Sequence, residues 1–354
     1  MVFSSLFNFD EPIYKPSPVV VPPTSQIVST TINSTLNESI KADIDSFIVK
    51  NNLNKGEVAD YIGKKPLIIH CCHHKTGTVV IEKVLRVVCQ QLNLKYQYCP
   101  QSQLESDTDV WMQHHSHVDF TLIDRPVIGT HMVRNPCAIV VSAYEYHKNT
   151  IEPWANRKIK SMDGLSYREI LNKLDMEEGV IFEMKNDFYV ESSRNTIMDM
   201  YNWDYRRPNF LELKFEDLMT NYDATLANMF KHYGFTRDMI NTSLMVASKY
   251  NLRNKKEEDV HNNKHVTNKN MDLEKWKEYF SIQEIAKRFW KIFPEDIFKK
   301  IGYNDDNLTT LTEQNILGKK TKALMLTDEQ KILMLKEKLW KTYGGETPLM
   351  ISDT

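Results

Sequence analysis

Short apolar stretches alternate with amphipathic stretches from about residue 65 to about residue 234, and this alternation constrains the fold more than any other feature. The apolar runs have the length of strands, and most are followed by a segment with helical periodicity. Parallel strands need crossover connections, usually helices, which then cover both faces of the sheet. The pattern predicts an α/β protein with a central parallel sheet flanked by helices on both faces. The expected strands are 66–71, 109–117, 126–133 and 210–215, and the expected helices are 79–92, 136–149, 195–205 and 222–234.

The two ends of the chain differ in composition from this central region. The first stretch is rich in Pro, Ser and Thr and has no periodicity, which is typical of a flexible segment. Near the other end, a Thr-x-x-Gln capping box at Thr327 predicts a helix. The expected organisation is a flexible leader over 1–35, a helical lead-in over 36–64, one main domain over 65–303 and a helical tail over 304–354.

Charge and cysteine usage limit the partners and the location that we expect. The 354 residues carry a formal charge of −2, with acidic and basic side chains interspersed, so no nucleic-acid partner is expected. The five cysteines are odd in number and lie in or beside apolar segments, and the first residues lack the pattern of a secretory signal. A reducing, cytoplasmic location is therefore expected. No apolar run approaches the 18 residues of a membrane span, so no integral membrane segment is expected.

The stretch "IIHCCHHKTGT" at 68–78 places cysteines, histidines and a lysine at the end of an apolar run. A cysteine phosphatase loop needs an arginine six residues after its cysteine, but Gly77 and Thr78 occupy those positions. A zinc site needs ligands that converge, whereas neighbouring side chains of an extended segment point to opposite faces. We therefore interpret Cys71 and Cys72 as small core residues and expect no metal site.

The remaining pattern is a strand, then "HHKTGT", then a helix. Backbone N–H groups at a helix N-terminus, with a lysine beside them, form a cradle for an anion. In loops that bind nucleoside triphosphates the lysine follows a glycine, but Lys75 precedes Gly77 and the earlier glycine is missing. The stretch predicts a phosphate-binding loop of a different kind from that of ordinary ATP- or GTP-binding proteins.

A second motif, "RNPCAIVVSAY" at 134–144, follows another predicted strand. Asn135 is suited to cap a helix and Pro136 to occupy its first turn. Arg134, at the end of the strand, and Ser142, on the helix, are placed to hold one phosphate from two sides.

The order of "KTGT", "RNP" with "SAY", and "FLELKFEDL" at 210–218 resembles that of the sulfotransferases that use 3′-phosphoadenosine 5′-phosphosulfate (PAPS). This resemblance implies a P-loop NTPase-like sulfotransferase fold, PAPS as co-substrate, no metal, and a small-molecule or carbohydrate acceptor. Phe215 stands where the family has a tyrosine, and Lys269 stands where it has a late arginine. The residues that the resemblance assigns to PAPS binding are Lys75, Thr76, Gly77, Thr78, Arg134, Ser142, Phe215 and Lys269.

The resemblance also implies a catalytic histidine and a catalytic lysine. "HSHVD" aligns His117 with the family's general base, and His115 would share its face if the chain were extended there, with His114 opposite. Histidine suits this role because its ordinary pKa is near neutral. The residue that acts as base stays open among the three, with His117 favoured. Lys75 would neutralise the charge that develops on the leaving oxygen.

Two other functions are compatible with the sequence. One is a nucleotide or small-molecule kinase with an unusual phosphate loop, which would need a carboxylate for Mg²⁺, and Asp124 is the available candidate. The other is a sulfotransferase-like protein that binds a nucleotide without catalysis. Val79 and Val80 stand near the position where many family members have a tryptophan that stacks on adenine, so adenine would be held differently. The acceptor and the oligomeric state stay open.

Overall fold

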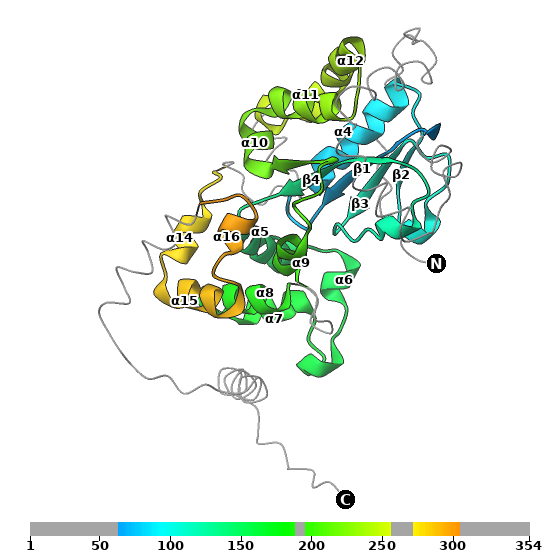
Figure 1. Ribbon diagram of the computed structural model, residues 1–354. Coiled ribbons are helices and arrows are strands. Elements are labelled where there is room, and N and C mark those ends of the chain that lie inside the picture. The colour runs from blue at the N-terminus through cyan, green and yellow to red at the C-terminus, as the bar shows by residue number, and fades with distance from the viewer. Residues whose placement is uncertain (1–62, 188–194, 256–271, 305–354) are drawn as a thin grey trace, which may run out of the picture.

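The computed structural model describes residues 63–187, 195–255 and 272–304, which are coloured in Figure 1. The predicted leader, the predicted helix at Thr327 and Lys269 lie outside the described residues. The division of the chain at its two ends therefore stays a prediction.

Five strands of the described chain form one sheet in the order β2, β3, β1, β4, β5, and every neighbouring pair is parallel. The predicted central parallel sheet is confirmed. β2 was not predicted, because three residues are too few to show a period. The strands are β1 Leu67–Cys72, β2 Tyr96–Tyr98, β3 Val110–His114, β4 Val127–Val133 and β5 Phe210–Lys214.

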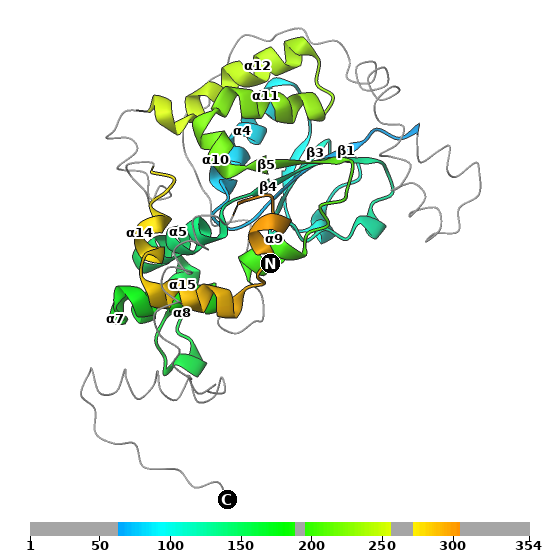
Figure 2. The ribbon, with the colours of Figure 1, turned by 60° about the vertical axis from the view of Figure 1, so that its left-hand side comes forward.

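Helices lie on both sides of this sheet, with α4, α11 and α12 on one side and α5, α7, α8 and α15 on the other (Figures 1 and 2). This arrangement also confirms the prediction. The described α-helices are α4 Thr78–Gln91, α5 Pro136–Asn149, α6 Pro153–Asn156, α7 Tyr167–Lys173, α8 Met176–Asn186, α9 Thr196–Asn202, α10 Phe215–Thr220, α11 Tyr222–His232, α12 Arg237–Ala247, α14 Trp276–Phe280, α15 Gln283–Ile292 and α16 Ile297–Lys300. Short 3₁₀ helices span Gln101–Gln103, Phe120–Leu122, Lys160–Met162, Ser248–Tyr250 and Leu252–Asn254.

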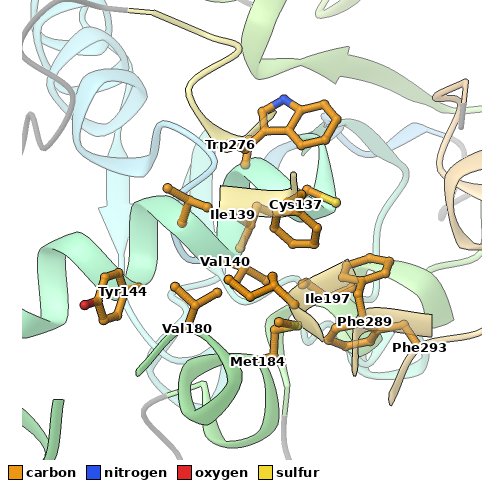
Figure 3. Close-up of a cluster of buried hydrophobic side chains, with 14 of the residues drawn as sticks. Cys137, Ile139, Val140, Tyr144, Val180, Met184, Ile197, Trp276, Phe289 and Phe293 are labelled. Atoms are coloured by element: carbon orange, nitrogen blue, oxygen red, sulfur yellow. The ribbon is translucent and has the colours of Figure 1, made fainter. Parts of the chain in front are cut away.

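The helix α5 begins as its sequence predicts. The side chain of Asn135 accepts hydrogen bonds from the N–H groups of Cys137 and Ala138, and Pro136 occupies the first turn. Figure 3 shows Ile139 and Val140 of α5 among buried side chains of α8 and α15. Burial of this helix therefore fixes the direction in which it leaves the end of β4.

The predicted strand over 109–117 ends at His114, because His115 and Ser116 have φ angles of 74° and 56° in the left-handed region. Ser116 Oγ donates a hydrogen bond to the carbonyl oxygen of Cys72 at 3.0 Å, which holds this turn against the end of β1. The expectation that His115 and His117 share one face of an extended chain is wrong, since the chain is not extended there. Their ring planes lie 76° apart.

The cysteines occupy positions that fit the interpretation of Cys71 and Cys72 as core residues. All five are described and free, and Cys99 alone is partly exposed. Among the helices of the described residues, none combines the length and the apolar character that a membrane span requires.

Candidate functional site

The carboxyl ends of the parallel strands meet at one edge of the sheet, and the loop over 73–77 leaves β1 at this edge. From β1 the chain runs to β2 and then β3 on one side and crosses to β4 on the other, so β1 lies where the strand order reverses. Open parallel sheets bind ligands in the crevice outside such a reversal. Both predicted phosphate motifs follow strands that end there.

Threonine hydroxyls stabilise the loop from within. Thr76 Oγ1 accepts a hydrogen bond from the N–H of His73 and donates one to its carbonyl oxygen, at 2.9 and 2.8 Å. Thr78 Oγ1 donates to the same oxygen at 3.0 Å, and the N–H of Thr76 donates to it at 3.2 Å. In contrast, the N–H groups of Gly77 and Thr78 donate to no backbone carbonyl of the described residues. These two groups start α4 and are available to an anion.

Gly77 precedes α4 with φ 92°, a conformation that L side chains rarely adopt. A Cβ atom at this position would lie 3.0 Å from a ring carbon of Phe215. The Phe215 ring also lies 4.3 Å from the guanidinium carbon of Arg134. Phe215, at the start of α10, therefore packs between the loop and the arginine.

Arg134 joins the two motifs that the sequence predicts to bind phosphate. Its Nη1 donates a hydrogen bond to the carbonyl oxygen of Lys75 at 2.8 Å, while its Nε is buried with no hydrogen-bond partner among the described residues. Burial lowers the pKa of Arg134, and the carboxylate of Glu216 opposes this effect. A buried guanidinium with an unsatisfied donor fits the requirements of a phosphate site.

Lys75 is held in the left-handed conformation with φ 63°, and its ammonium lies 4.0 Å from the centre of the Tyr146 ring. Burial, together with the charge of Arg134, lowers the pKa of Lys75 to about 7, against the opposing effect of Glu152. Ser142 lies buried on α5, in the same helix as Tyr146. Lys75 thus contacts Arg134 through its carbonyl oxygen, and through its ammonium it contacts the helix that carries Ser142.

Two histidine pairs fix the loop from opposite sides. His73 Nε2 lies 2.7 Å from Nε2 of His131 on β4, and His131 Nδ1 lies 2.6 Å from a carboxyl oxygen of Glu212 on β5. Burial lowers the pKa of His73 well below its usual range and that of His131 to about 3, so both rings are neutral. Burial also raises the pKa of Glu212 to about 8.

The second pair repeats this arrangement on the neighbouring residue. His74 Nε2 lies 2.9 Å from Nε2 of His147 on α5, and His147 Nδ1 lies 2.9 Å from both carboxyl oxygens of Glu183 on α8. The Tyr167 hydroxyl donates to Glu183 at 3.1 Å. Adjacent loop residues are therefore tied to the sheet and to the helical layer, which limits the positions open to Lys75.

The three candidate bases lie in different surroundings. His114 stacks on His115, with 3.9 Å between ring centres, and burial lowers the pKa of His114 to about 4. His115 and His117 line a cavity of about 280 Å³. His117 Nε2 lies 2.9 Å from Oδ2 of Asp199 on α9, and the side chain of His117 is 45 % exposed. The cavity therefore contains a histidine that is accessible and paired with a carboxylate.

Asp199 and Arg207 of the cavity were not predicted from the sequence. Glu212 and Glu183, the carboxylates of the two histidine pairs, were not predicted either. No local pattern marks Asp199, which is 82 positions from His117. His131 and Glu212 are cross-strand neighbours in the parallel register of β4 and β5, but a sequence does not show which strands are adjacent.

Asp124, the carboxylate that a kinase would need, precedes β4 and pairs with Lys64 at 2.8 Å. It lies near the amino ends of the strands, since the N–H of Leu67 bonds to Pro126 at the start of β1. The loop over 73–77 lies at the opposite edge of the sheet. Within the described residues, no group of three or more His, Cys, Asp or Glu side chains is arranged to hold a metal ion.

Comparisons with known proteins find matches among solved structures alone. No protein-family model matches the sequence, and no curated protein matches it. Among solved structures, the chain is similar to that of mouse sulfotransferase SULT7A1 complexed with PAP. The alignment covers 74 % of this chain and 93 % of the other, with 13 % identity and a TM-score of 0.45.

Proposed function

We propose that this chain is a sulfotransferase that moves a sulfuryl group from PAPS to a hydroxyl or amine of a small-molecule or carbohydrate acceptor. The main support is the hydrogen bond from Arg134 to the carbonyl oxygen of Lys75, which brings the two phosphate motifs together. A nucleotide with phosphates at both its 5′ and 3′ positions needs two anion sites close to each other. The sequence order of the motifs, quoted above, supports the same substrate.

Each part of the site has a role in this proposal. The N–H groups of Gly77 and Thr78 bind the 5′-phosphate, and Lys75 neutralises the oxygen that leaves the sulfur. Arg134 and Ser142 bind the 3′-phosphate, with Phe215 packed beneath the loop. The in-line transfer needs no metal in this scheme, because preorganised N–H and ammonium donors supply the positive charge.

The acceptor occupies the cavity beside His117, which removes its proton. Imidazoles, carboxylates and aromatic rings line this cavity, a mixture that suits a polar acceptor with an accessible hydroxyl. We also propose, from the cysteine usage described above, that the protein acts in the cytoplasm.

The kinase alternative is less well supported, because Asp124 lies at the other edge of the sheet from the loop. The non-catalytic alternative is compatible with the same phosphate site and differs only in the absence of transfer. A binding experiment distinguishes the sulfotransferase from the kinase, and a transfer experiment then distinguishes it from the non-catalytic protein.

The first experiment measures the melting temperature with adenosine 3′,5′-bisphosphate in EDTA and with ATP plus Mg²⁺. We expect the bisphosphate to raise the melting temperature more, because stabilisation follows affinity for the folded state. Stronger stabilisation by ATP with Mg²⁺ would contradict the proposal and favour a kinase. Transfer of radiolabelled sulfuryl groups to a library of phenols, sterols and sugars then separates the enzyme from the non-catalytic protein.

The second experiment assigns the 3′-phosphate. Arg134→Ala should weaken binding of adenosine 3′,5′-bisphosphate by about 2 to 4 kcal/mol, as expected for loss of a charge-assisted contact. Binding of adenosine 5′-phosphate, which lacks the 3′-phosphate, is the control and should change much less. Equal losses for the two nucleotides would remove Arg134 from the 3′-phosphate site.

A further inference from the structure

The pairing of His117 with Asp199 has consequences for the reaction proposed above, and the inference rests on that proposed function. His117 Nε2 lies 2.9 Å from Asp199 Oδ2. An ionised carboxylate only accepts hydrogen bonds, so Nε2 carries the proton in a neutral His117 ring. Its Nδ1 then has a free electron pair, which is the state that a general base needs.

The two partners differ in how firmly the chain holds them. His117 follows the left-handed turn after β3, where its N–H donates to the side chain of Gln113 at 3.0 Å. Asp199 lies on α9, whose first turn is capped by the Asn195 side chain and whose Ile197 is buried. A carboxylate on a packed helix can therefore orient an imidazole on an exposed loop.

We propose that Asp199 is the positioning residue for His117, and that it holds the base in the correct tautomer and stabilises the imidazolium that forms during transfer. Serine proteases use a carboxylate on the catalytic histidine in a similar way. In the step itself, the acceptor O–H bond breaks and its proton moves to Nδ1 of His117. The oxygen forms a bond to sulfur while the bond from sulfur to the 5′-phosphate oxygen breaks, and this oxygen keeps the electron pair.

The same cavity offers a matched control for this proposal. Asp204 is another carboxylate of the cavity wall, but it pairs with Arg206 at 2.9 Å rather than with a candidate base. Replacing Asp199 or Asp204 by asparagine removes the same charge with the same change in shape. A general effect of charge in the cavity would appear in both variants, and a positioning effect only in Asp199→Asn.

The experiment measures kcat and KM for sulfuryl transfer to the library compound that labels best. Calorimetry with adenosine 3′,5′-bisphosphate is run on each variant. We expect Asp199→Asn to lower kcat by about a hundredfold or more, with KM for the acceptor and the affinity for the bisphosphate unchanged. Asp204→Asn removes a carboxylate from the wall of the acceptor cavity, so it should mainly raise KM for the acceptor and should lower kcat far less than Asp199→Asn does. In a His117→Ala background, Asp199→Asn should cause no further loss, since its effect acts through the imidazole.

Three results would overturn the inference. The first is a kcat of Asp199→Asn close to that of the wild-type protein, and the second is an equal loss of kcat in Asp204→Asn. The third is a loss of kcat on adding Asp199→Asn to His117→Ala that is as large as the loss in the wild-type background. All three leave the proposed function intact. An original protein that binds no bisphosphate, or transfers no sulfuryl group to any acceptor, would instead overturn the proposed function and this inference with it.

Discussion

If the proposed nucleotide binds at Lys75, the lowered pKa of this residue should make the affinity depend on pH near neutrality, where arginine and backbone N–H groups do not titrate. Burial and the neighbouring charge of Arg134 lower the pKa of Lys75 to about 7 in the free protein. Only the protonated ammonium attracts a phosphate, so binding of a nucleotide should raise the pKa again. We therefore expect the affinity for the proposed nucleotide to fall as the pH rises through 7 and beyond.

The size of the effect follows from the fraction of Lys75 that is protonated. With a pKa of about 7, this fraction is about 24 % at pH 7.5 and about 1 % at pH 9.0. If only the protonated form binds, the affinity for adenosine 3′,5′-bisphosphate falls about 24-fold over this range, or about 1.9 kcal/mol. The phosphates do not contribute, because their second pKa is near 6 and they are fully ionised throughout.

Isothermal titration calorimetry at several pH values between 7.5 and 9.0 measures this affinity. Lys75→Arg is the matched control, because a guanidinium stays charged over the whole range. This variant should bind with an affinity that is nearly independent of pH. Lys75→Ala should bind weakly at every pH and should also lose the dependence.

An affinity of the original protein that changes less than about threefold between pH 7.5 and 9.0 would refute the reasoning, because Lys75 would then not titrate near the nucleotide. A dependence that persists in Lys75→Arg would point to another titrating group. Either result would also weaken the assignment of Lys75 to the leaving oxygen.

Two further predictions concern stability. The left-handed backbone at Gly77 should by itself make Gly77→Ala lower the free energy of unfolding by about 1 to 2 kcal/mol. The contact of the new Cβ atom with the Phe215 ring should lower it further. Gly164 also has a positive φ, 73°, but has open space around it, so Gly164→Ala serves as the control in urea titrations. Equal losses of unfolding free energy in the two variants would contradict a contribution from the Phe215 contact. His70 and His131 are buried with pKa values lowered to about 3, so these two side chains together bind two more protons in the unfolded chain than in the folded chain between pH 3 and 6.5. Stability should therefore fall on acidification by about 2.7 kcal/mol per pH unit from these two groups, and Glu212, with a pKa raised to about 8, should offset half of this above pH 4.5. Equal unfolding free energies at pH 5 and 6 would contradict this balance.

The strands and helices with long apolar or periodic stretches were predicted close to their observed bounds. The strands β1 and β4 and the helices α4 and α5 were predicted within about two residues. The strands β1 and β4 are buried on both faces and therefore consist largely of apolar residues, and α5 is marked by Asn135 and Pro136 at its start. The end of β3 was not predicted, because the left-handed turn at His115 and Ser116 contains no glycine that would indicate a turn in the sequence. The helices α7, α8 and α15 also escaped prediction, although α7 begins with a capping box at Ser166.

The candidate site was predicted in part. Lys75, Gly77, Arg134 and Ser142 were named from motifs, and the structure brings Lys75 and Arg134 into contact. Their assignment to a nucleotide stays a proposal. The partners of the histidines could not be predicted, because each partner lies on a different element from its histidine.

The sequence by itself determined the order of β1, α4, β3, β4, α5, α9, β5 and α11 along the chain and the N-terminal cap of α5. These features depend on residues within one or two turns of each other, so spacing along the chain is enough to reveal them. Tertiary structure alone decided that His131 meets Glu212, that His147 meets Glu183 and that His117 meets Asp199. These contacts follow from the packing of elements that are 36 to 82 residues apart, and burial of a polar group requires a partner without specifying where along the chain it lies.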